Sequence, residues 1–225
     1  MRLPLLGFAV AKELHAPKAV GIFENGVIRD RPALESIFTI SDPPNVARAL
    51  YCGGVLDVMS LLQSGQVDLG FIGGAEVDRF GNLNTHWVEE SGKKIRLPGS
   101  GGAADIATLA RRCIIIMNHE KRRFRPRVHF ITSPGYGEGG DWRQMKHIHG
   151  GGPSRVITSL GIFSFEPASG EMLLSFFHPG VTVEEIRGET GWPLRVSEDL
   201  RETPPPSPEE LAAVRKYDPK GVWTA

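Results

Sequence analysis

Short apolar segments that alternate with helical patterns constrain the fold of this chain more than any other feature. Two of them, "VDLGFIGG" (67–74) and "CIIIMN" (113–118), are typical of buried strands, and "AADIATLARR" (103–112) between them has apolar residues at helical spacing. Continuous apolar strands that alternate with helices indicate a parallel sheet covered on both faces. After residues 150–153 the pattern changes to three closely spaced strands, "SRVITSL", "GIFSF" and "EMLLSFF". We therefore expect an α/β fold, an open, mostly parallel sheet flanked by helices with an antiparallel C-terminal part.

The rest of the sequence supplies elements that complete this pattern. They are a strand over 18–23 and helices over 4–14, 47–65, 182–190 and from near Pro208 onward. Thr182 is the expected cap of the helix that follows it. We interpret residues 1–225 as a single domain, in which 201–225 form a proline-stiffened linker and the C-terminal helix.

Composition narrows the class of protein. The 26 basic and 26 acidic residues balance, so binding of nucleic acid is not indicated. No run of about 18 apolar residues occurs, so no membrane-spanning helix is predicted. The two cysteines, Cys52 and Cys113, and the seven histidines have no spacing typical of a disulfide framework or a metal site. These features fit a cytoplasmic protein without a bound metal.

An acid at the end of an apolar strand is the first candidate functional residue. Glu24 directly follows the strand pattern over 18–23. Asn25 and Gly26 after it form a turn pair, because both residues tolerate positive φ. Glu24 is therefore expected where the strand ends and the chain turns sharply. From its position alone, a solvated loop acid is the more common interpretation.

Two glycine-rich stretches are the other candidates. "GGAEVDRFGNLN" (73–84) follows a predicted strand, and "GSGGAADIA" (99–107) opens onto a predicted helix. In open α/β sheets, ligands bind outside the carboxyl ends of the strands, so both stretches and Glu24 are expected to face one crevice. A helix N-terminus also offers backbone N–H groups to negative charge. Taken singly, such turns more often only reverse the chain, and "DRFGN" fits an ordinary hairpin.

Five segments in this order resemble one known family. They are "VAKELHAP", "ENG", "GGAEVDRFGNLN", "GSGGAADIA" and "HPGVTVEEIR". Together they resemble the β subunit of the glutaconate-type, class I coenzyme A transferases over nearly the whole chain. The resemblance implies the NagB/RpiA/CoA-transferase-like fold. It also implies transfer of CoA between an acyl-CoA and a free carboxylic acid, with the coenzyme A thioester as substrate and no cofactor. An α subunit of related fold is the implied partner, and the active site is expected at the interface of the two subunits.

The same resemblance implies roles for individual residues. The nucleophile of the family is the glutamate of "ENG", here Glu24, and Asn25 beside it is expected to contact substrate. The amides of Gly101 and Gly102 are candidate donors to the tetrahedral oxyanion. Relatives often have Gln or Asn at the position of Glu76. A carboxyl group donates a hydrogen bond only when protonated, so either the pKa of Glu76 is raised or its role has changed.

Some features leave alternatives open. Family members usually have a helix and a glycine-containing strand before "LPLL", which this sequence lacks. Some relatives are hydrolases that open rings of steroid-derived acyl-CoAs, but those lack the "ENG" glutamate and the "GSGG" pattern, so transfer is favoured. An inactive scaffold subunit is the other alternative. The basic segments "IRDRP" (28–32) and "HEKRRFRPR" (119–127) are either solvated loops or contacts for a CoA phosphate or a second carboxylate.

Overall fold

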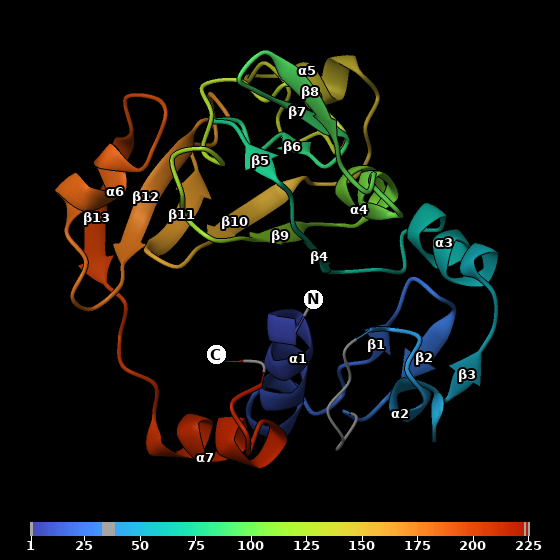
Figure 1. Ribbon diagram of the computed structural model, residues 1–225. Helices are drawn as coiled ribbons and strands as arrows, with labels where there is room; N and C mark the ends of the chain where they lie inside the picture. The colour runs from blue at the N-terminus through green and yellow to red at the C-terminus, as the bar shows by residue number, and fades with distance from the viewer. Residues whose placement is uncertain (1, 33–38, 223, 225) are drawn as a thin grey trace. The chain divides into compact units, whose positions relative to one another are not determined.

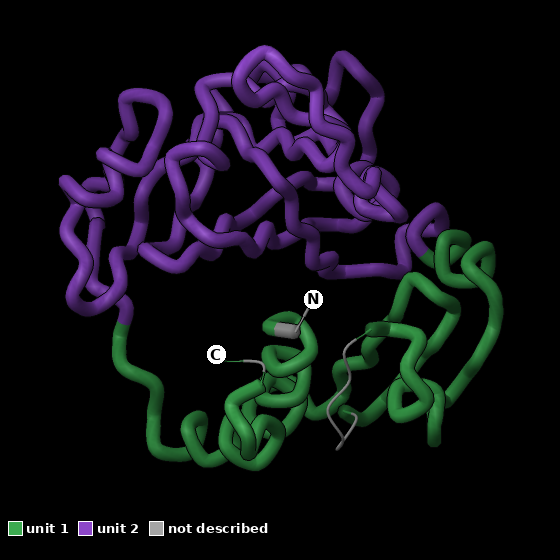
Figure 2. Tube along the Cα trace, in the orientation of Figure 1, with its two compact units in different colours: residues 1–61, 204–225 green, residues 62–203 purple. Residues whose placement is uncertain are grey.

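The structure, a computed structural model, describes residues 2–32, 39–222 and 224 (Figure 1). Contacts along the chain divide it into two compact units (Figure 2). Unit 1 comprises Met1–Leu61 and Pro204–Ala225, and unit 2 comprises Leu62–Thr203. The interpretation of the whole chain as one domain remains a prediction.

Unit 2 is built on one six-stranded sheet of order β13-β12-β11-β10-β9-β4. Its strands are β4 (Gly70–Ile72), β9 (Cys113–Ile116), β10 (Pro153–Ile157), β11 (Gly161–Phe165), β12 (Met172–Phe177) and β13 (Arg195–Glu202). β4, β9 and β10 are parallel, β10, β11 and β12 are antiparallel in turn, and β13 is parallel to β12. The predicted α/β fold, with its mostly parallel sheet and antiparallel C-terminal part, is confirmed.

The main hydrophobic core belongs to this sheet. Ile115 of β9 is fully buried, whereas Ile114 and Ile116 are half-buried. The strand therefore alternates in burial, although its continuous apolar sequence predicted burial on both faces. Phe124 and Phe163 are fully buried in the same core, with their ring centroids 5.9 Å apart.

Two predicted helices of unit 2 are confirmed, α4 (Ala103–Leu109) and α6 (Val183–Gly188). α4 packs closely against β4, because a Cβ atom at Gly70 would lie 2.2 Å from Cγ2 of Ile106. Thr182 caps α6 with its hydroxyl oxygen, as expected. A glycine at position 70 thus allows the close approach of helix and strand.

Unit 1 brings the two ends of the chain together. α1 (Arg2–Leu14) packs on α7 (Pro208–Tyr217), and both helices confirm predictions. Leu6 is buried against apolar side chains of α7. The carboxylate of Glu13 accepts a hydrogen bond from Nζ of Lys216 at 2.8 Å.

A small antiparallel sheet and two further helices complete the secondary structure of this part of the chain. They are β1 (Gly21–Ile22), β2 (Val27–Arg29), β3 (Tyr51–Cys52), α2 (Pro43–Val46) and α3 (Val55–Gln63). The helix predicted over 47–65 is wrong in its first half, because β3 pairs with β2 and the helix begins only at Val55. Gly53 and Gly54 separate the two elements, and the Gly54 N–H donates to the carboxylate of Asp57 at 2.7 Å, which turns the chain into α3.

The sequence did not predict several short elements of unit 2. They are β7 (Trp87–Glu90), β8 (Lys93–Arg96) and α5 (Trp142–Met145), and the eight-residue edge strand β13 was not predicted either. Two further short strands are β5 (Glu76–Val77) and β6 (Leu83–Asn84). The hairpin interpretation of "DRFGN" is confirmed, since this segment joins antiparallel β5 and β6 with a φ of 71° at Gly81. Among the described residues, no helix has the length and apolar character needed to cross a membrane.

A histidine lies inside the core of unit 2. His119 is 5% exposed and stacks on Phe124, with ring centroids 3.8 Å apart. Its two ring nitrogens lie 3.3 Å and 3.2 Å from the hydroxyl oxygens of Thr158 and Thr190. Burial lowers the pKa of His119 to about 4, so the ring is neutral in the folded protein at neutral pH.

This burial predicts a loss of stability in acid. The folded-state pKa of His119 lies below the ordinary value of 6.5. Between those values the unfolded chain binds a proton that the folded protein does not, so stability falls as pH decreases from 6.5 to about 4. The loss amounts to at most about 3 kcal/mol. In His119→Asn, the melting temperature should depend less on pH over this range. The exposed His149→Asn variant should keep the wild-type profile, and an unchanged slope in His119→Asn would contradict the assignment.

Candidate active site

Glu24 lies half-buried at the tip of the β1–β2 hairpin, where the sequence places it. The loop closes through hydrogen bonds from Gly26 N to the Phe23 carbonyl at 3.0 Å and from Phe23 N to the Val27 carbonyl at 2.8 Å. Of the expected turn pair, only Gly26 has a positive φ, 101°, and Asn25 does not. The loop is therefore a three-residue hairpin with a glycine bulge, not a two-residue turn.

A close backbone approach fixes this loop. The Gly53 N–H donates to the Gly26 carbonyl at 2.9 Å, and a Cβ atom at Gly26 would lie 2.2 Å from the Gly53 carbonyl oxygen. Asn25 donates from Nδ2 to the carbonyl of Ile40 at 2.8 Å. The Asn25 side chain thus anchors the hairpin to a neighbouring segment of unit 1, and its contact with substrate remains a prediction.

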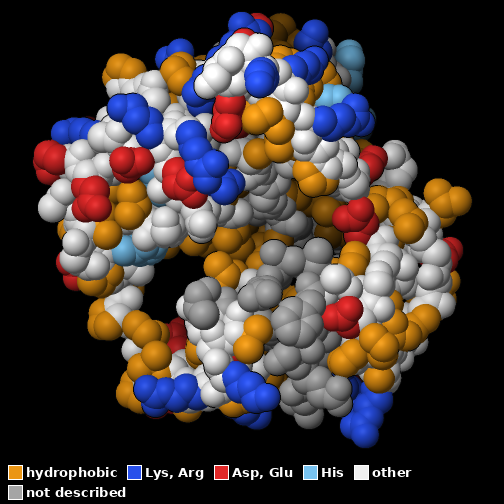
Figure 3. Space-filling view, in the orientation of Figure 1, with side chains coloured by type: hydrophobic (Ala, Val, Ile, Leu, Met, Phe, Trp, Pro, Cys, Tyr) orange, Lys and Arg blue, Asp and Glu red, His pale blue; other side chains and the backbone are white. Residues whose placement is uncertain are grey.

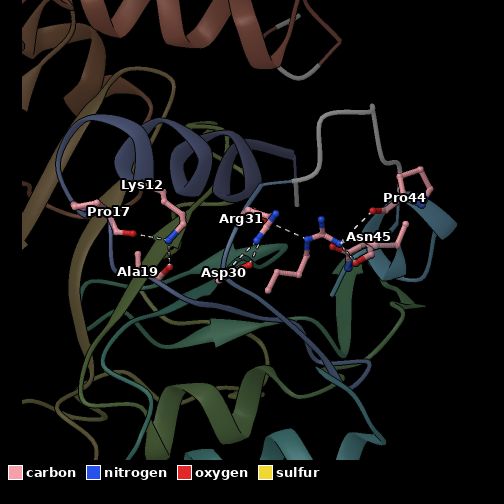
Figure 4. Close-up of polar contacts among 9 residues, drawn as sticks. Lys12, Pro17, Ala19, Asp30, Arg31, Pro44 and Asn45 are labelled. Carbon is pink, nitrogen blue, oxygen red and sulfur yellow. Dashed lines mark hydrogen bonds and ion pairs between the residues drawn. The ribbon is translucent and has the colours of Figure 1, made fainter. Parts of the chain in front are cut away.

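A buried arginine fixes the second strand of the hairpin. Arg29 is 3% exposed and donates to the backbone carbonyls of Arg31, Pro44, Asn45 and Ala47. Figure 4 labels Pro44 and Asn45, whose carbonyls accept two of these hydrogen bonds. Burial, followed by the nearby charge of Arg31, lowers the pKa of Arg29. Arg29, the arginine of "IRDRP" that lies on β2, therefore stabilises the fold through these hydrogen bonds.

Glu76, on β5 of unit 2, is buried among hydrogen-bond donors. Its Oε2 accepts from Asn84 Nδ2 at 2.7 Å and from the His129 backbone N–H at 3.1 Å. Its Oε1 lies 2.6 Å from Nδ1 of His129 and 3.8 Å from Nε of Arg125. The carboxylate offers acceptors to all of these groups, so the geometry favours an internal acceptor role over donation to a substrate.

The buried carboxylate connects to the glycine-rich loop through Asn84. Oδ1 of Asn84 accepts from the backbone N–H of His86 at 2.9 Å. The returning chain then bonds to this segment, with Leu97 N donating to the His86 carbonyl and Gly99 N to the Thr85 carbonyl, each at 2.9 Å. The position of the "GSGG" segment thus depends on the side chain of Asn84, which links Glu76 to the backbone at His86.

The "GSGG" segment is a turn that leads into α4. Gly99 and Gly101 have positive φ of 102° and 52°, and the Ala103 N–H donates to the Ser100 carbonyl at 3.0 Å. Gly102 is buried at the N-cap of the helix, whereas Gly101 is exposed. Within the described part of the chain, the Gly101 amide has no hydrogen-bond acceptor. It is therefore available to a ligand.

A cleft of about 270 Å³ separates this turn from the end of β4. It is lined by Gly74, Ala75, Thr85, Leu97, Pro98, Gly99 and Arg123. Gly74 and Ala75 of the first glycine-rich stretch and Gly99 of the second line this cleft, whereas Gly101 and Gly102 are not among its lining residues. Glu24 belongs to unit 1, so its place in the same crevice remains a prediction. Among described residues, no group of three or more His, Cys, Asp or Glu side chains is arranged to hold a metal ion.

The sequence matches the family model described as Coenzyme A transferase over residues 1–189. The chain belongs to the coenzyme A transferase family. The match includes the "ENG" hairpin, the β5–β6 segment and the "GSGG" loop.

Individual relatives agree with the family. This coenzyme A transferase chain is 38% identical over 218 residues to one of the subunits of the 3-oxoadipate CoA-transferase of Pseudomonas knackmussii, and the match covers 96% of this chain and 84% of that protein. Its fold matches the crystal structure of glutaconate coenzyme A-transferase from Acidaminococcus fermentans with a TM-score of 0.87, at 30% identity and with coverage of 99% of this chain and 88% of that chain. The decarboxylase AibA/AibB matches with a TM-score of 0.84, at 25% identity and with coverage of 99% and 86%. The prediction of a CoA-transferase β subunit, an enzyme subunit with an α-subunit partner, is confirmed.

Some residues around the candidate site of this transferase subunit escaped the sequence analysis. Glu76 and Asn84 lie in one quoted motif, but His129 is 53 positions from Glu76 and carries no local signal. Arg29 lay in a basic segment, where a solvated cation is the ordinary expectation. Its burial depends on carbonyls supplied by a segment about fifteen residues later, which no spacing rule reveals.

The Glu76 network predicts different effects for two substitutions. Glu76→Gln keeps an acceptor oxygen for Asn84, and its amide can donate to Nδ1 of His129 in the other tautomer, so activity and melting temperature should change little. Glu76→Ala leaves buried donors unpaired and should loosen residues 84–99. Hydrogen exchange of backbone amides in that segment measures the effect, with the exposed Glu138→Ala as control. Lost activity in Glu76→Ala without faster exchange would instead indicate direct substrate contact.

Proposed function

We propose that Glu24 is the nucleophile of this transferase and that CoA transfer proceeds through a glutamyl-CoA thioester on its side chain. The observation that supports this proposal is the placement of Glu24 at the tip of a rigid hairpin. Gly53 and Asn25 fix the loop through backbone carbonyls, and Arg29 fixes the strand that follows it. A carboxylate nucleophile must be held in this way, because covalent catalysis requires a reacting atom at a fixed distance from the thioester.

The reaction exchanges one acyl bond for another at each step. An oxygen of Glu24 attacks the thioester carbonyl carbon, the C–S bond breaks, and the CoA thiolate leaves with the electron pair. The thiolate attacks the glutamyl carbonyl of the resulting anhydride, which releases the first acid as its carboxylate. A second carboxylate attacks the glutamyl-CoA thioester, and the sequence runs in reverse to give the new acyl-CoA. Acyl bonds and electron pairs balance without a redox group, in keeping with the expectation that no cofactor is needed.

The tetrahedral intermediates need a donor for the developing negative oxygen. We propose the Gly101 amide for this role, with Gly102 as its neighbour. The exposed Gly101 N–H at the start of α4 lacks an acceptor in the described structure. One such donor contributes roughly 3–4 kcal/mol to transition-state stabilisation in other acyl-transfer enzymes.

We also propose a partner subunit and a class of substrates for this transferase. The α subunit completes the active site at the subunit interface, in a heterodimer or a larger αβ assembly. The named relatives act on 3-oxoadipate and glutaconate, which are both dicarboxylic acids. We therefore propose that this subunit handles CoA thioesters of dicarboxylic acids.

One experiment distinguishes CoA transfer from three other functions. They are ring-opening hydrolysis of an acyl-CoA, a scaffold role without chemistry, and the decarboxylation that names one structural relative. Incubation of the αβ complex with an acyl-CoA, followed by borohydride reduction and peptide mass spectrometry, distinguishes them. Modification of the peptide that contains Glu24 supports transfer. Release of CoA or carbon dioxide from an unmodified subunit supports one of the other reactions.

The proposed nucleophile predicts the effect of a substitution at Glu24. Glu24→Gln preserves the shape of the side chain but removes the attacking carboxylate. CoA transfer by the αβ complex should fall by several orders of magnitude, while the melting temperature and CoA binding stay near wild type. Asp30→Asn removes a negative charge from the end of the same hairpin and should leave turnover largely intact. Near wild-type turnover in Glu24→Gln would exclude the anhydride mechanism.

The proposed oxyanion donor predicts the effect of substitutions in the backbone of the "GSGG" loop. The φ of 52° at Gly101 lies in a region that valine rarely adopts and asparagine tolerates. Gly101→Val should twist the amide out of line and lower kcat about a hundredfold, with CoA binding and melting temperature nearly unchanged. Gly101→Asn should retain most activity. Unfolding of the valine variant would assign the glycine a purely structural role, and normal turnover would place the oxyanion donor elsewhere.

A further inference from the structure

The hairpin formed by β7 and β8 carries a second cleft, of about 290 Å³. All four residues that line it have a basic or an aromatic side chain: His86, Trp87, Lys94 and Arg96. Trp87 and Arg96 lie directly opposite one another across the two strands. Lys94 is two positions from Arg96 and so shares its face of the hairpin. Nζ of Lys94 lies 3.9 Å from the centroid of the Trp87 ring, a cation–π contact that holds a long side chain in place.

The two cations of this cleft are Lys94, whose ammonium group contacts Trp87, and Arg96. Among the described residues, neither of them forms an ion pair. Glu89 is opposite Lys94 across the hairpin, but it does not line the cleft. Glu89 shares the face of the two cations and offsets part of their charge, but one carboxylate against two cations leaves a net positive charge that a bound anion can balance. The cleft therefore has the charge and the donors to bind phosphate groups.

Several residues that line the basic cleft are adjacent in sequence to residues that line the candidate active-site cleft. Leu97, Pro98 and Gly99, which follow Arg96 in sequence, line the cleft beside the "GSGG" loop, and Thr85 of that cleft precedes His86. Three residues span at most about 10 Å of backbone. One ligand with an anionic head and a flexible arm can therefore occupy both clefts.

We propose that the cleft of His86, Trp87, Lys94 and Arg96 binds the phosphorylated nucleotide end of coenzyme A. The thioester end then reaches the "GSGG" loop. This inference rests on the proposed function, because it takes a CoA thioester as the substrate. Lys94 and Arg96 bind the phosphates, and Trp87 positions Lys94. In Figure 3, lysine and arginine side chains gather at the top of the view, where Figure 1 has β7, β8 and α5.

The other basic segments are less suited to this role. Arg29 is buried and bonded to backbone carbonyls. Arg122 and Arg123 both pair with Glu120, at 2.5 Å and 3.1 Å. Arg125 lies beside the carboxylate of Glu76. Lys121 and Arg127 also form no ion pair among the described residues, but neither lines one of the two clefts. The cations of the β7–β8 hairpin therefore offer the better-placed phosphate site.

The test compares substrates with and without the nucleotide in variants of the αβ complex. Lys94→Gln and Arg96→Gln should each raise KM for an acyl-CoA about tenfold, with kcat within about twofold of wild type. The same variants should not change kcat/KM for the corresponding acyl-pantetheine thioester, which lacks the nucleotide. Lys93→Gln, on the opposite face of the same hairpin, is the matched control and should behave as wild type. Because salt screens exposed charges, the KM for acyl-CoA should also rise less steeply with salt in the two variants than in wild type.

Direct binding separates this inference from the nucleophile assignment. Calorimetric titration of CoA into the Glu24→Gln complex should show an affinity about tenfold lower when Lys94→Gln is added. That result is independent of any covalent step, so it holds even if Glu24 is not the nucleophile. An unchanged CoA affinity, or an equal loss with the acyl-pantetheine substrate, would overturn the proposal. Loss of the α subunit from the Lys94→Gln complex would also overturn it, by assigning the hairpin to the subunit interface.

Discussion

The buried carboxylate of Glu76 determines how the segments around the candidate site of unit 2 are joined. A charged group away from water is costly unless donors surround it, and here Asn84 and His129 supply both side-chain and backbone N–H groups. Nδ1 of His129 must carry its proton to donate to the carboxylate, which fixes the tautomer of the ring. Through Asn84 the same network places the chain that returns to the "GSGG" loop.

Both units also use a buried arginine to satisfy irregular backbone. Arg29 collects carbonyls around the "ENG" hairpin, and Arg143 in unit 2 donates to the carbonyls of Ala107, Gly135 and Gly150. Burial lowers the pKa of both guanidinium groups. Loops without regular secondary structure leave carbonyls unpaired, and a guanidinium has five donors in a fixed fork to pair with them. These cations serve the fold, so net charge or basic segments alone do not locate an anion site in this protein.

The sequence predicted what depends on local pattern and missed what depends on distant contacts. β4, β9 and α4 were predictable because apolar runs and helical spacing are local signals. β3 was not, because its residues form a strand only by pairing with β2. Glu24 was placed correctly at a turn, since glycine and asparagine mark turns in any context. Of the two turn residues, only Gly26 has a positive φ. Its conformation is fixed by the close approach of Gly53, which sequence spacing does not reveal.

Two histidines of unit 2, His119 and His129, are held in contacts that bear on which kind of nucleophile the protein can use. His119 is enclosed between two threonine hydroxyls and His129 is bonded to Glu76, so neither is available to relay a proton. A serine nucleophile would need such a base, because its hydroxyl must lose a proton before it attacks. A carboxylate needs none, and a thiolate leaves a thioester without being protonated first. The proposed reaction at Glu24 therefore requires only a fixed nucleophile and an oxyanion donor, and it makes no demand on the histidines that the fold has already used.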